Sequence, residues 1–147
     1  PTLFDNVNDI EFSKNEGQIF NGKTHLRPYK TDLGTAKHSI VLSSPKLYNA
    51  ERNSLVEYLM NLSNQGIEVL VLTHTANEQT EYLQRKGLSV KIIPTLSLCT
   101  TIIDKTIVWY GAINALGYTS EEDNVIKVTD NNLADELTNA LLSSNSA

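Results

Sequence analysis

The sequence has very little cysteine and histidine, the residues that build disulfides and most zinc sites. Cys99 is the single cysteine, and the three histidines (His25, His38 and His74) are scattered along the chain without metal-ligand spacing. An intrachain disulfide and a cysteine-rich zinc site are therefore excluded, and neither a metal nor another cofactor is expected. An unpaired cysteine is typical of a reducing compartment, so the sequence predicts a cytoplasmic protein.

Long apolar runs are also missing. The longest, such as residues 67–72, are far below the roughly 18 residues that cross a bilayer, so no membrane partner is expected. The chain begins at Pro1 and its only methionine is Met60, so we expect a piece of a longer polypeptide. The 147 residues, of which 40% are hydrophobic and 20% charged, suffice for one soluble globular domain with its own core.

Positive charge is scarce overall but concentrated in one part of the chain. The net charge is −5, yet residues 14–52 hold seven basic side chains against three acidic ones, a local balance of +4. Residues 121–136 hold six acids against one lysine, a local balance of −5. An acidic chain of this kind does not exclude a polyanionic partner.

Hydrophobic periodicity and turn residues predict an α/β domain with a βαβαβ series. The first helix places Leu55, Leu59 and Leu62 on one face, with Asn49 as its N-cap and Gly66 at its end. The apolar run at 67–72 is typical of a central parallel strand that is buried on both faces. In chain order we expect a strand at 39–43, a helix between 49 and 66, a strand at 67–72, a helix at 77–86 ended by Gly87, and a strand at 88–93.

A hairpin, a further strand and a final helix are expected to complete the domain. The strands are predicted at 98–103, 107–114 and 124–128, and the helix carries Leu133, Leu137, Ala140 and Leu141 on one face with Asn131 or Asn132 as its cap. The domain is expected to span residues 31–142, with a helical turn at 32–37. Residues 1–30 are expected to be an extension of uncertain structure with one short strand at 18–20, and residues 143–147 a flexible tail.

Three residues near the predicted hairpin stand at a characteristic spacing. Asp104 is followed after six residues by Gly111, and Asn114 comes three positions later. The pattern resembles the phospholipase D superfamily, whose signature HxKxxxxD is followed after six residues by G-S/A-x-N. The surrounding sequence, Ile-Ile-Asp and then Ile-Val-Trp-Tyr-Gly-Ala-Ile-Asn, is similar to phospholipase D-like modules of DNA-processing proteins, including helicases and nucleases. The resemblance covers roughly residues 31–142 and implies one phospholipase D-like half, a mixed, mostly parallel sheet flanked by helices.

The signature is degenerate in this chain. Counting back from Asp104, Ser97 stands where the family has its nucleophilic histidine, and Cys99 where it has its phosphate-binding lysine. In the family the imidazole attacks phosphorus to form a phosphohistidine, while the lysine and the asparagine amide stabilise charge on the phosphoryl oxygens. A serine is a weak nucleophile without a neighbouring base, and a cysteine supplies no positive charge. The resemblance thus implies a catalytically silent half, and we assign no catalytic residue.

Each of these residues also has a structural explanation. Asp104 can be a turn residue, Gly111 a bulge and Asn114 a strand-end cap, although their joint spacing favours the family interpretation. Cys99 is expected to be a small, buried hydrophobe with a raised pKa. His74 follows a strand where open α/β sheets bind ligands, but a lone histidine there is more often a loop residue with satisfied hydrogen bonds.

The basic segment is the second functional indication. Its basic side chains alternate with aromatic ones, a mixture that neutralises phosphates and stacks bases; an ordinary lysine-bearing surface is the alternative. The candidate nucleic-acid-binding residues are Lys23, Arg27, Lys30 and Lys37, interleaved with Phe20, His25 and Tyr29.

Three functions remain open from the sequence. The first is a non-catalytic phospholipase D-like module of a larger DNA-processing protein, such as a helicase, ATPase or restriction-type enzyme, that binds nucleic acid or a partner. The candidate partners are a partner subunit, a second copy of the chain and other parts of the parent chain. The second is a phosphodiesterase or nuclease half whose intact HxK motif lies elsewhere in the parent or in a partner. The third is a scaffold that dimerises through the surface equivalent to the active site.

Overall fold

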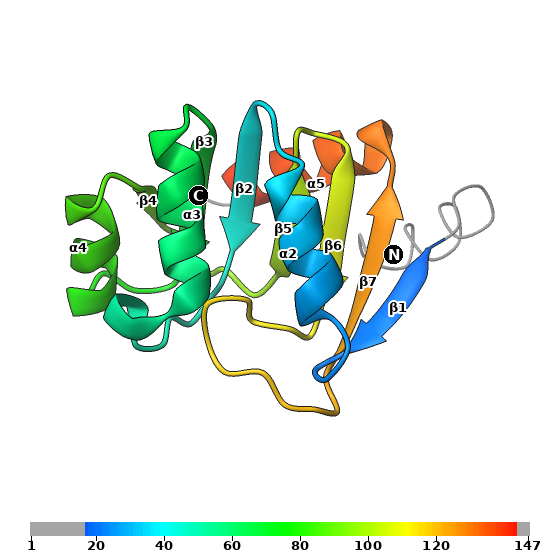
Figure 1. Cartoon of the computed structure of the whole chain (residues 1–147), viewed down its shortest axis with the longest axis horizontal. Coiled ribbons are helices and arrows are strands. Elements are labelled where there is room, and N and C mark those ends of the chain that lie inside the picture. Colours follow the sequence, from blue (N-terminus) through cyan, green and yellow to red (C-terminus); the bar gives the residue numbers. More distant parts are fainter. Residues whose placement is uncertain (1–16, 144–147) are drawn as a thin grey trace.

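The structure, a computed structural model, describes residues 17–143. They form three layers, in which one seven-stranded sheet lies between helices on its two faces (Figure 1). The strands are β1 (Gln18–Asn21), β2 (Ser39–Ser43), β3 (Glu68–Thr73), β4 (Ser89–Ile92), β5 (Cys99–Ile103), β6 (Ile107–Gly111) and β7 (Asn124–Thr129). The helices are α2 (Leu26–Gly34), α3 (Ser54–Asn64), α4 (Glu78–Arg85) and α5 (Asn131–Ser143), with a short 3-10 turn η1 (Ala50–Arg52). The predicted α/β class is confirmed.

The sheet has the order β1-β7-β6-β5-β2-β3-β4. Strands β2, β3 and β4 are parallel, as the βαβαβ pattern predicts. The pairs β2/β5, β5/β6, β6/β7 and β1/β7 are antiparallel. The sheet is therefore mixed, as expected, but antiparallel pairing predominates, and the expectation of a mostly parallel sheet is wrong. The reason is that the second half of the domain returns through hairpins rather than through helical crossovers.

Helices cover both faces of the sheet. In Figure 1, α2 and α3 lie in front of it and α5 lies behind. Leu33 of α2, Leu59 of α3 and Leu83 of α4 pack in one hydrophobic core against the first face. Leu133 and Leu137 of α5 pack in a second core against the other face. Because every interior strand has helices on one or both faces, apolar residues occupy consecutive strand positions, which explains the continuous apolar runs of the sequence.

Two of the predicted helix caps are wrong. Asn53, rather than Asn49, caps α3, with its side-chain oxygen accepting from the backbone N–H of Leu55 at 2.9 Å. Asn49 has a left-handed φ of 47° and precedes the 3-10 turn η1. At α5 the capping oxygen belongs to Asp130 and accepts from Leu133 N–H at 3.0 Å, rather than to Asn131 or Asn132. Polar runs of this kind offer several capping side chains, and tertiary packing selects one.

Regular structure begins well before residue 31, the expected start of the domain. Strand β1 pairs with β7, with Ile19 opposite Ile126. Helix α2 begins at Leu26, whereas the sequence indicated only a helical turn at 32–37. Pro28 interrupts the periodicity in the sequence, but a proline in the first turn costs no hydrogen bond, because that N–H has no partner in the helix anyway. Of the expected tail, Ser143 is the last residue of α5, and 144–147 lie outside the described residues.

Candidate functional site

The residues at the positions of the family signature are divided between the two ends of strand β5. Cys99 opens β5 directly opposite Gly111, the last residue of β6. Asn114 lies in the loop that follows β6, and Ser97 is exposed just before β5. Asp104 follows the other end of β5, about 17 Å away by strand geometry. The fold thus brings Cys99, Gly111 and Asn114 together and leaves Asp104 apart from them.

Asp104 joins the β5–β6 turn to the segment before β2. Its carboxylate accepts from the backbone N–H groups of Lys37, His38 and Ser39 at 2.9, 2.8 and 3.0 Å. Burial raises the pKa of Asp104, but the three backbone donors and nearby His38 outweigh it, so the pKa lies below its usual range. Asp104 and Lys105 have φ of 52° and 56°, as in a two-residue type I′ turn. The structure gives Asp104 a turn-forming and bridging role.

Gly111 is required by the close approach of β6 and β7. Its φ is 152°, and a Cβ atom at this position would lie 2.5 Å from the backbone oxygen of Asn124. No larger residue fits there without moving β7. The glycine of the signature therefore has a packing reason in this chain.

The Asn114 amide ties two loops together. With its nitrogen turned toward the Ser44 hydroxyl, it donates to Ser44 Oγ and to the Lys46 carbonyl at 3.1 Å, and its oxygen accepts from Lys46 N–H at 3.3 Å. Ser44 Oγ also donates to the Lys46 carbonyl at 2.8 Å and accepts from Leu116 N–H at 3.1 Å. The Asn114 amide is thus engaged in holding the loop after β6 against the loop after β2.

These two loops enclose a cleft of about 440 Å³. The cleft lies at the carboxyl end of β2, the kind of position at which open α/β sheets bind ligands. Lys46 is the only charged residue among those that line it: Pro45, Lys46, Leu47, Tyr48, Cys99, Ala112, Asn114, Gly117 and Tyr118. We call this space the site-equivalent cleft, because Cys99 and Asn114 stand at signature positions.

Sequence reasoning missed Lys46, Tyr48 and Tyr118, which form much of this cleft. In the sequence, Lys46 is one of the seven basic residues of the segment 14–52. The signal that could have found it and Tyr48 is their place directly after β2, where a ligand of an α/β sheet is expected. Tyr118 is brought near by the long loop between β6 and β7, which no sequence pattern positions.

Cys99 is half-buried at the floor of the cleft. Burial raises the pKa of its thiol, and the negative charge of Asp123 raises it further. The raised pKa was expected from the apolar strand and is confirmed. The thiol is therefore protonated at neutral pH and is a poor nucleophile.

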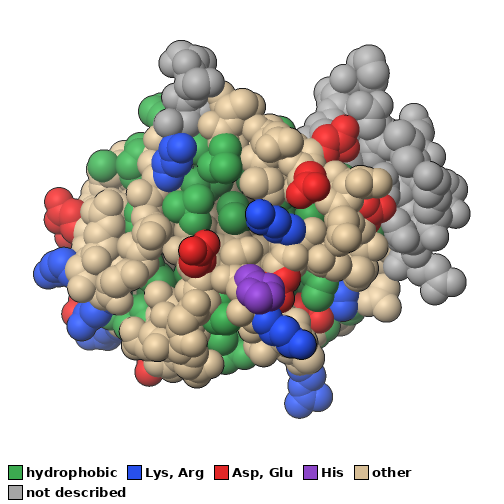
Figure 2. All heavy atoms as spheres, turned by 90° about the horizontal axis from the view of Figure 1, so that it is seen from above, with side chains coloured by type: hydrophobic (Ala, Val, Ile, Leu, Met, Phe, Trp, Pro, Cys, Tyr) green, Lys and Arg blue, Asp and Glu red, His purple; other side chains and the backbone are tan. Residues whose placement is uncertain are grey.

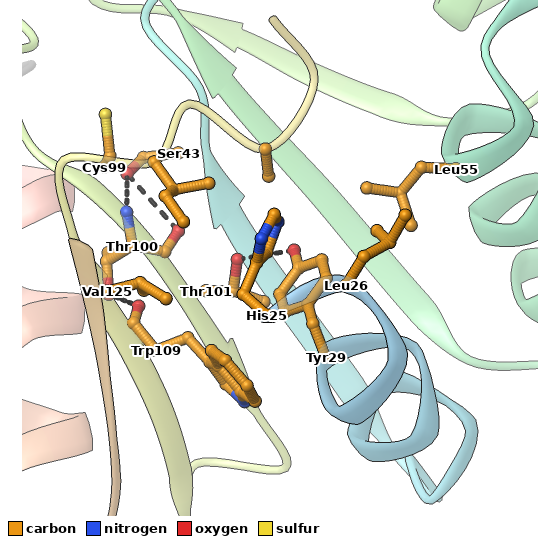
Figure 3. A pocket seen from close by; sticks show the side chains of 12 residues that line it. His25, Leu26, Tyr29, Ser43, Leu55, Cys99, Thr100, Thr101, Trp109 and Val125 are labelled. Atoms are coloured by element: carbon orange, nitrogen blue, oxygen red, sulfur yellow. Dashed lines mark hydrogen bonds between the residues drawn. The ribbon is translucent and has the colours of Figure 1, made fainter. Parts of the chain in front are cut away.

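A small internal cavity lies behind Cys99, between the sheet and α2 (Figure 3). Its volume is about 30 Å³, room for water but not for a substrate. Tyr29 and Thr101 share a hydrogen bond of 2.8 Å in its wall, and burial raises the pKa of Tyr29. The ring nitrogen Nδ1 of His25, also in the wall, lies 3.1 Å from the backbone oxygen of Asn21. The cavity is a packing gap and not a binding site.

His74 is a loop residue whose polar groups are satisfied by neighbouring loops, as expected for a lone histidine after a strand. Its Nε2 contacts the backbone oxygen of Leu96, and its backbone N–H donates to the Pro45 carbonyl at 3.2 Å. It joins the loops after β2, β3 and β4. In the part of the chain that the structure describes, no three His, Cys, Asp or Glu side chains are grouped so as to hold a metal.

The four predicted nucleic-acid-binding residues follow helix α2 from end to end. Lys23 precedes α2, Arg27 and Lys30 lie one turn apart on it, and Lys37 follows it. Lys23, Arg27 and Lys37 are exposed, and Lys30 is partly so. They form a stripe, here called the α2 stripe, rather than one convergent site.

The two ends of the α2 stripe have different surroundings. Lys23 pairs with Glu121 at 3.6 Å, in the loop that also carries Tyr118. Lys37 follows the other end of α2. Figure 2 shows the molecule from above, with Lys and Arg side chains interspersed with Asp and Glu. Charge alone therefore does not mark one patch as the binding surface.

Solved structures show what fold this is. The chain is similar to Nuc from Salmonella typhimurium, a phospholipase D family member, with a TM-score of 0.72 and 14% identity over 89% of this chain and 94% of that one. It is similar to NucT from Helicobacter pylori, with a TM-score of 0.68 and 15% identity over 89% and 98% of the two chains. TrmBL2, an archaeal chromatin protein described as showing a novel mode of DNA binding, matches with a TM-score of 0.64 and 13% identity over 96% of this chain and 56% of that one.

The fold is therefore phospholipase D-like, as the signature spacing implied. No protein-family model matches the chain, and no curated protein matches its sequence significantly. Among residues 17–143, none of the helices is long and apolar enough to cross a bilayer.

Proposed function

We propose that this chain is a non-catalytic phospholipase D-like module that binds nucleic acid within a larger DNA-processing protein, such as a helicase, ATPase or restriction-type enzyme. The observation that carries the proposal is the composition of the site-equivalent cleft. No imidazole is among its lining residues, and Cys99 and an engaged Asn114 stand where the resemblance expects a lysine and a free amide.

Phosphodiester hydrolysis by this cleft would need a nucleophile and a base. Ser97 is exposed and is not among the residues that line the cleft. Cys99 is present, but its raised pKa keeps it as a thiol. No histidine lines the cleft, and His74 contacts the backbone oxygen of Leu96 with its Nε2 atom. These features support binding without bond cleavage.

Nucleic acid is the partner that the charges of the first helix favour. Three of the α2 stripe residues are exposed, and Arg27 and Lys30 lie on one face of the helix, where they can contact successive phosphates. The similarity in fold to TrmBL2, an archaeal chromatin protein described as binding DNA, supports the same class of partner.

A second candidate is a phosphodiesterase half that is completed by an intact HxK motif elsewhere in the parent chain or in a partner. Lys46 favours it, because this cation lies in the wall of the site-equivalent cleft and could contact a phosphate there. A dimerisation scaffold, the third hypothesis of the sequence analysis, is tested by light scattering.

Fluorescence anisotropy with a labelled oligonucleotide tests the proposal. We expect weak binding at about 50 mM salt that falls roughly 20- to 40-fold at about 200 mM, the loss for three phosphate contacts. Reversing the charges of Lys23, Arg27 and Lys30 should abolish it. Reversing Arg85 and Lys86, two exposed cations at the end of α4, is the matched control and should matter little. No binding at low salt, or equal loss from both sets, contradicts the proposal.

A further inference from the structure

Two exposed tyrosines stand in contact at the mouth of the site-equivalent cleft. Tyr48 is 47% exposed and Tyr118 is 72% exposed, and their ring centroids are 4.1 Å apart with an interplanar angle of 35°. Exposed large apolar side chains elsewhere in the described chain, Ile19 and Leu26, lie on other elements. Aromatic rings that are exposed to water beside a cleft are available to an incoming ligand.

The backbone holds this tyrosine pair in a fixed place. Tyr48 N–H donates to the Leu116 carbonyl at 2.8 Å, two residues before Tyr118. A Cβ atom on Gly117 would lie 2.9 Å from the Lys46 carbonyl, so the two loops touch closely beside the rings. A platform that is fixed before binding loses little conformational entropy when a ligand arrives.

The rings have the chemistry of a stacking surface. At a centroid distance of 4.1 Å nothing fits between them, so a flat ligand stacks on an outer face, and the more open one is that of Tyr118. The neighbouring Tyr48 hydroxyl raises the pKa of Tyr118, so its ring stays neutral at physiological pH. The cleft beside the pair has a volume of about 440 Å³, within the usual range of about 300–1,000 Å³ for ligand sites.

We infer that the Tyr48–Tyr118 pair stacks an unpaired base of single-stranded nucleic acid and that Lys46 contacts the adjoining phosphate. This inference rests on the proposed function and adds to it the class of nucleic acid that the cleft selects. Every base has a stacking face, so an aromatic pair next to one cation recognises single strands without reading sequence. A base inside a duplex is already stacked on its neighbours and is not available to the platform.

Acidic residues near the cleft limit its electrostatic attraction for a nucleic acid. Glu121, Glu122 and Asp123 follow Tyr118 on the same loop, and the charge of Asp123 reaches Cys99 at the cleft floor. Glu121 is paired with Lys23, and Asp123 accepts from Ser120 N–H at 2.9 Å. With these acids nearby, the cleft attracts a polyanion only weakly by charge. The rings contribute by stacking, which is independent of salt, whereas the single Lys46 contact and the α2 stripe supply the salt-dependent part of the binding.

The test compares the affinities of the whole chain for a fluorescein-labelled oligothymidylate and for a blunt duplex at about 50 and 200 mM salt. Tyr48→Ala with Tyr118→Ala should weaken oligothymidylate binding at least about fivefold at both salt concentrations and leave duplex binding unchanged. Tyr48→Phe with Tyr118→Phe should bind as the wild type does, because the rings remain. Lys46→Gln should lower the salt slope for oligothymidylate by about 0.7.

A matched control variant removes an exposed apolar side chain that does not line the cleft. Ile19→Ala on the edge strand β1, where the side chain is 70% exposed, should leave both affinities unchanged. Urea unfolding should show that the tyrosine variants remain folded with at most a small loss of stability, because Tyr118 is 72% exposed and Tyr48 is 47% exposed.

The outcomes separate the inference from the proposed function. Wild-type protein that binds neither probe overturns both. Binding of both probes with no effect of the alanine pair overturns the tyrosine platform alone. If the alanine pair instead lowers the mass measured by light scattering, the rings form a contact between copies of the chain, which also overturns the inference.

Discussion

Asp104 has a structural role in the turn between β5 and β6. Its carboxylate bonds three backbone N–H groups, and its left-handed φ suits the Asp or Asn that a tight turn prefers. Gly111 is likewise required where β6 and β7 approach each other, and the Asn114 amide joins two loops. Asp104, Gly111 and Asn114 therefore each have a role in the fold of this chain.

Asp104→Asn should lower the free energy of unfolding by about 1 kcal/mol at pH 7, because a neutral acceptor replaces a charged one at a partly exposed site. The pKa of Asp104 is lowered in the folded state, so its stabilisation is complete above the pKa of the unfolded chain, about 3.9, and is lost as the pH falls through the lower folded value. Urea unfolding at a series of pH values should therefore show the difference between variant and wild type shrinking below about pH 4. A difference that stays constant down to strongly acidic pH would contradict this assignment.

At the scale of elements, helix α2 is held to the sheet by a buried polar network. Asp32 of α2 accepts from Trp109 Nε1 of β6 at 2.9 Å and pairs with Lys127 Nζ of β7 at 2.8 Å. The side chains of Lys127 and Asp32 are only 23% and 11% exposed. Trp109 also stacks on Phe20 of β1 and meets Tyr29 of α2 edge to face, so this network fixes the N-terminal elements to the second half of the sheet.

A double-mutant cycle on Asp32→Asn and Lys127→Met should give a coupling energy of about 1–2 kcal/mol in urea unfolding. Asn keeps an acceptor for Trp109 and removes the charge, and this leaves the Lys127 ammonium partly buried without its carboxylate. The double variant should accordingly be more stable than the sum of the single effects predicts. The exposed pair Lys23–Glu121 is the control, and its cycle should give coupling near zero because water and salt screen it. Equal coupling energies in the two pairs would show that burial does not strengthen the ion pair between Asp32 and Lys127.

At the scale of the whole molecule, the chain has a phospholipase D-like fold with a cleft at the carboxyl end of β2. The two loops that enclose it come from segments about 70 residues apart, Ser44 and Asn114 being in contact. The basic α2 stripe begins beside the same loop, at the Lys23–Glu121 pair. A single strand that lies along α2 could therefore reach the cleft, which connects the two parts of the proposed surface.

The chain by itself should not hydrolyse bis-p-nitrophenyl phosphate or nick plasmid DNA above background, because Ser97 and Cys99 supply neither an imidazole nor a cation. A colorimetric assay for nitrophenolate and gel electrophoresis of the plasmid measure this. Ser97→Ala and the wild type should be indistinguishable. Hydrolysis by the wild type that disappears in Ser97→Ala would instead make Ser97 a nucleophile and overturn the non-catalytic proposal.

The sequence by itself determined the local features of this protein. Apolar runs predicted strands β2, β3 and β5, and Gly66 and Gly87, with φ of 101° and 95°, end α3 and α4 as expected. The spacing of Asp104, Gly111 and Asn114 identified the fold, because a hairpin followed by a loop is a local unit whose residues keep their distances along the chain.

Only the tertiary structure decided which strands pair, where α2 begins and what the cleft contains. Strand pairing depends on contacts between distant segments, so the predominance of antiparallel pairs could not be read from periodicity. The start of α2 depends on Tyr29 and Leu33 packing against the sheet, which outweighs the interruption at Pro28. Tyr48 and Tyr118 are isolated polar-loop residues in the sequence. They become one surface because the hydrogen bond from Tyr48 N–H to the Leu116 carbonyl and that from Leu116 N–H to Ser44 Oγ bring their loops together.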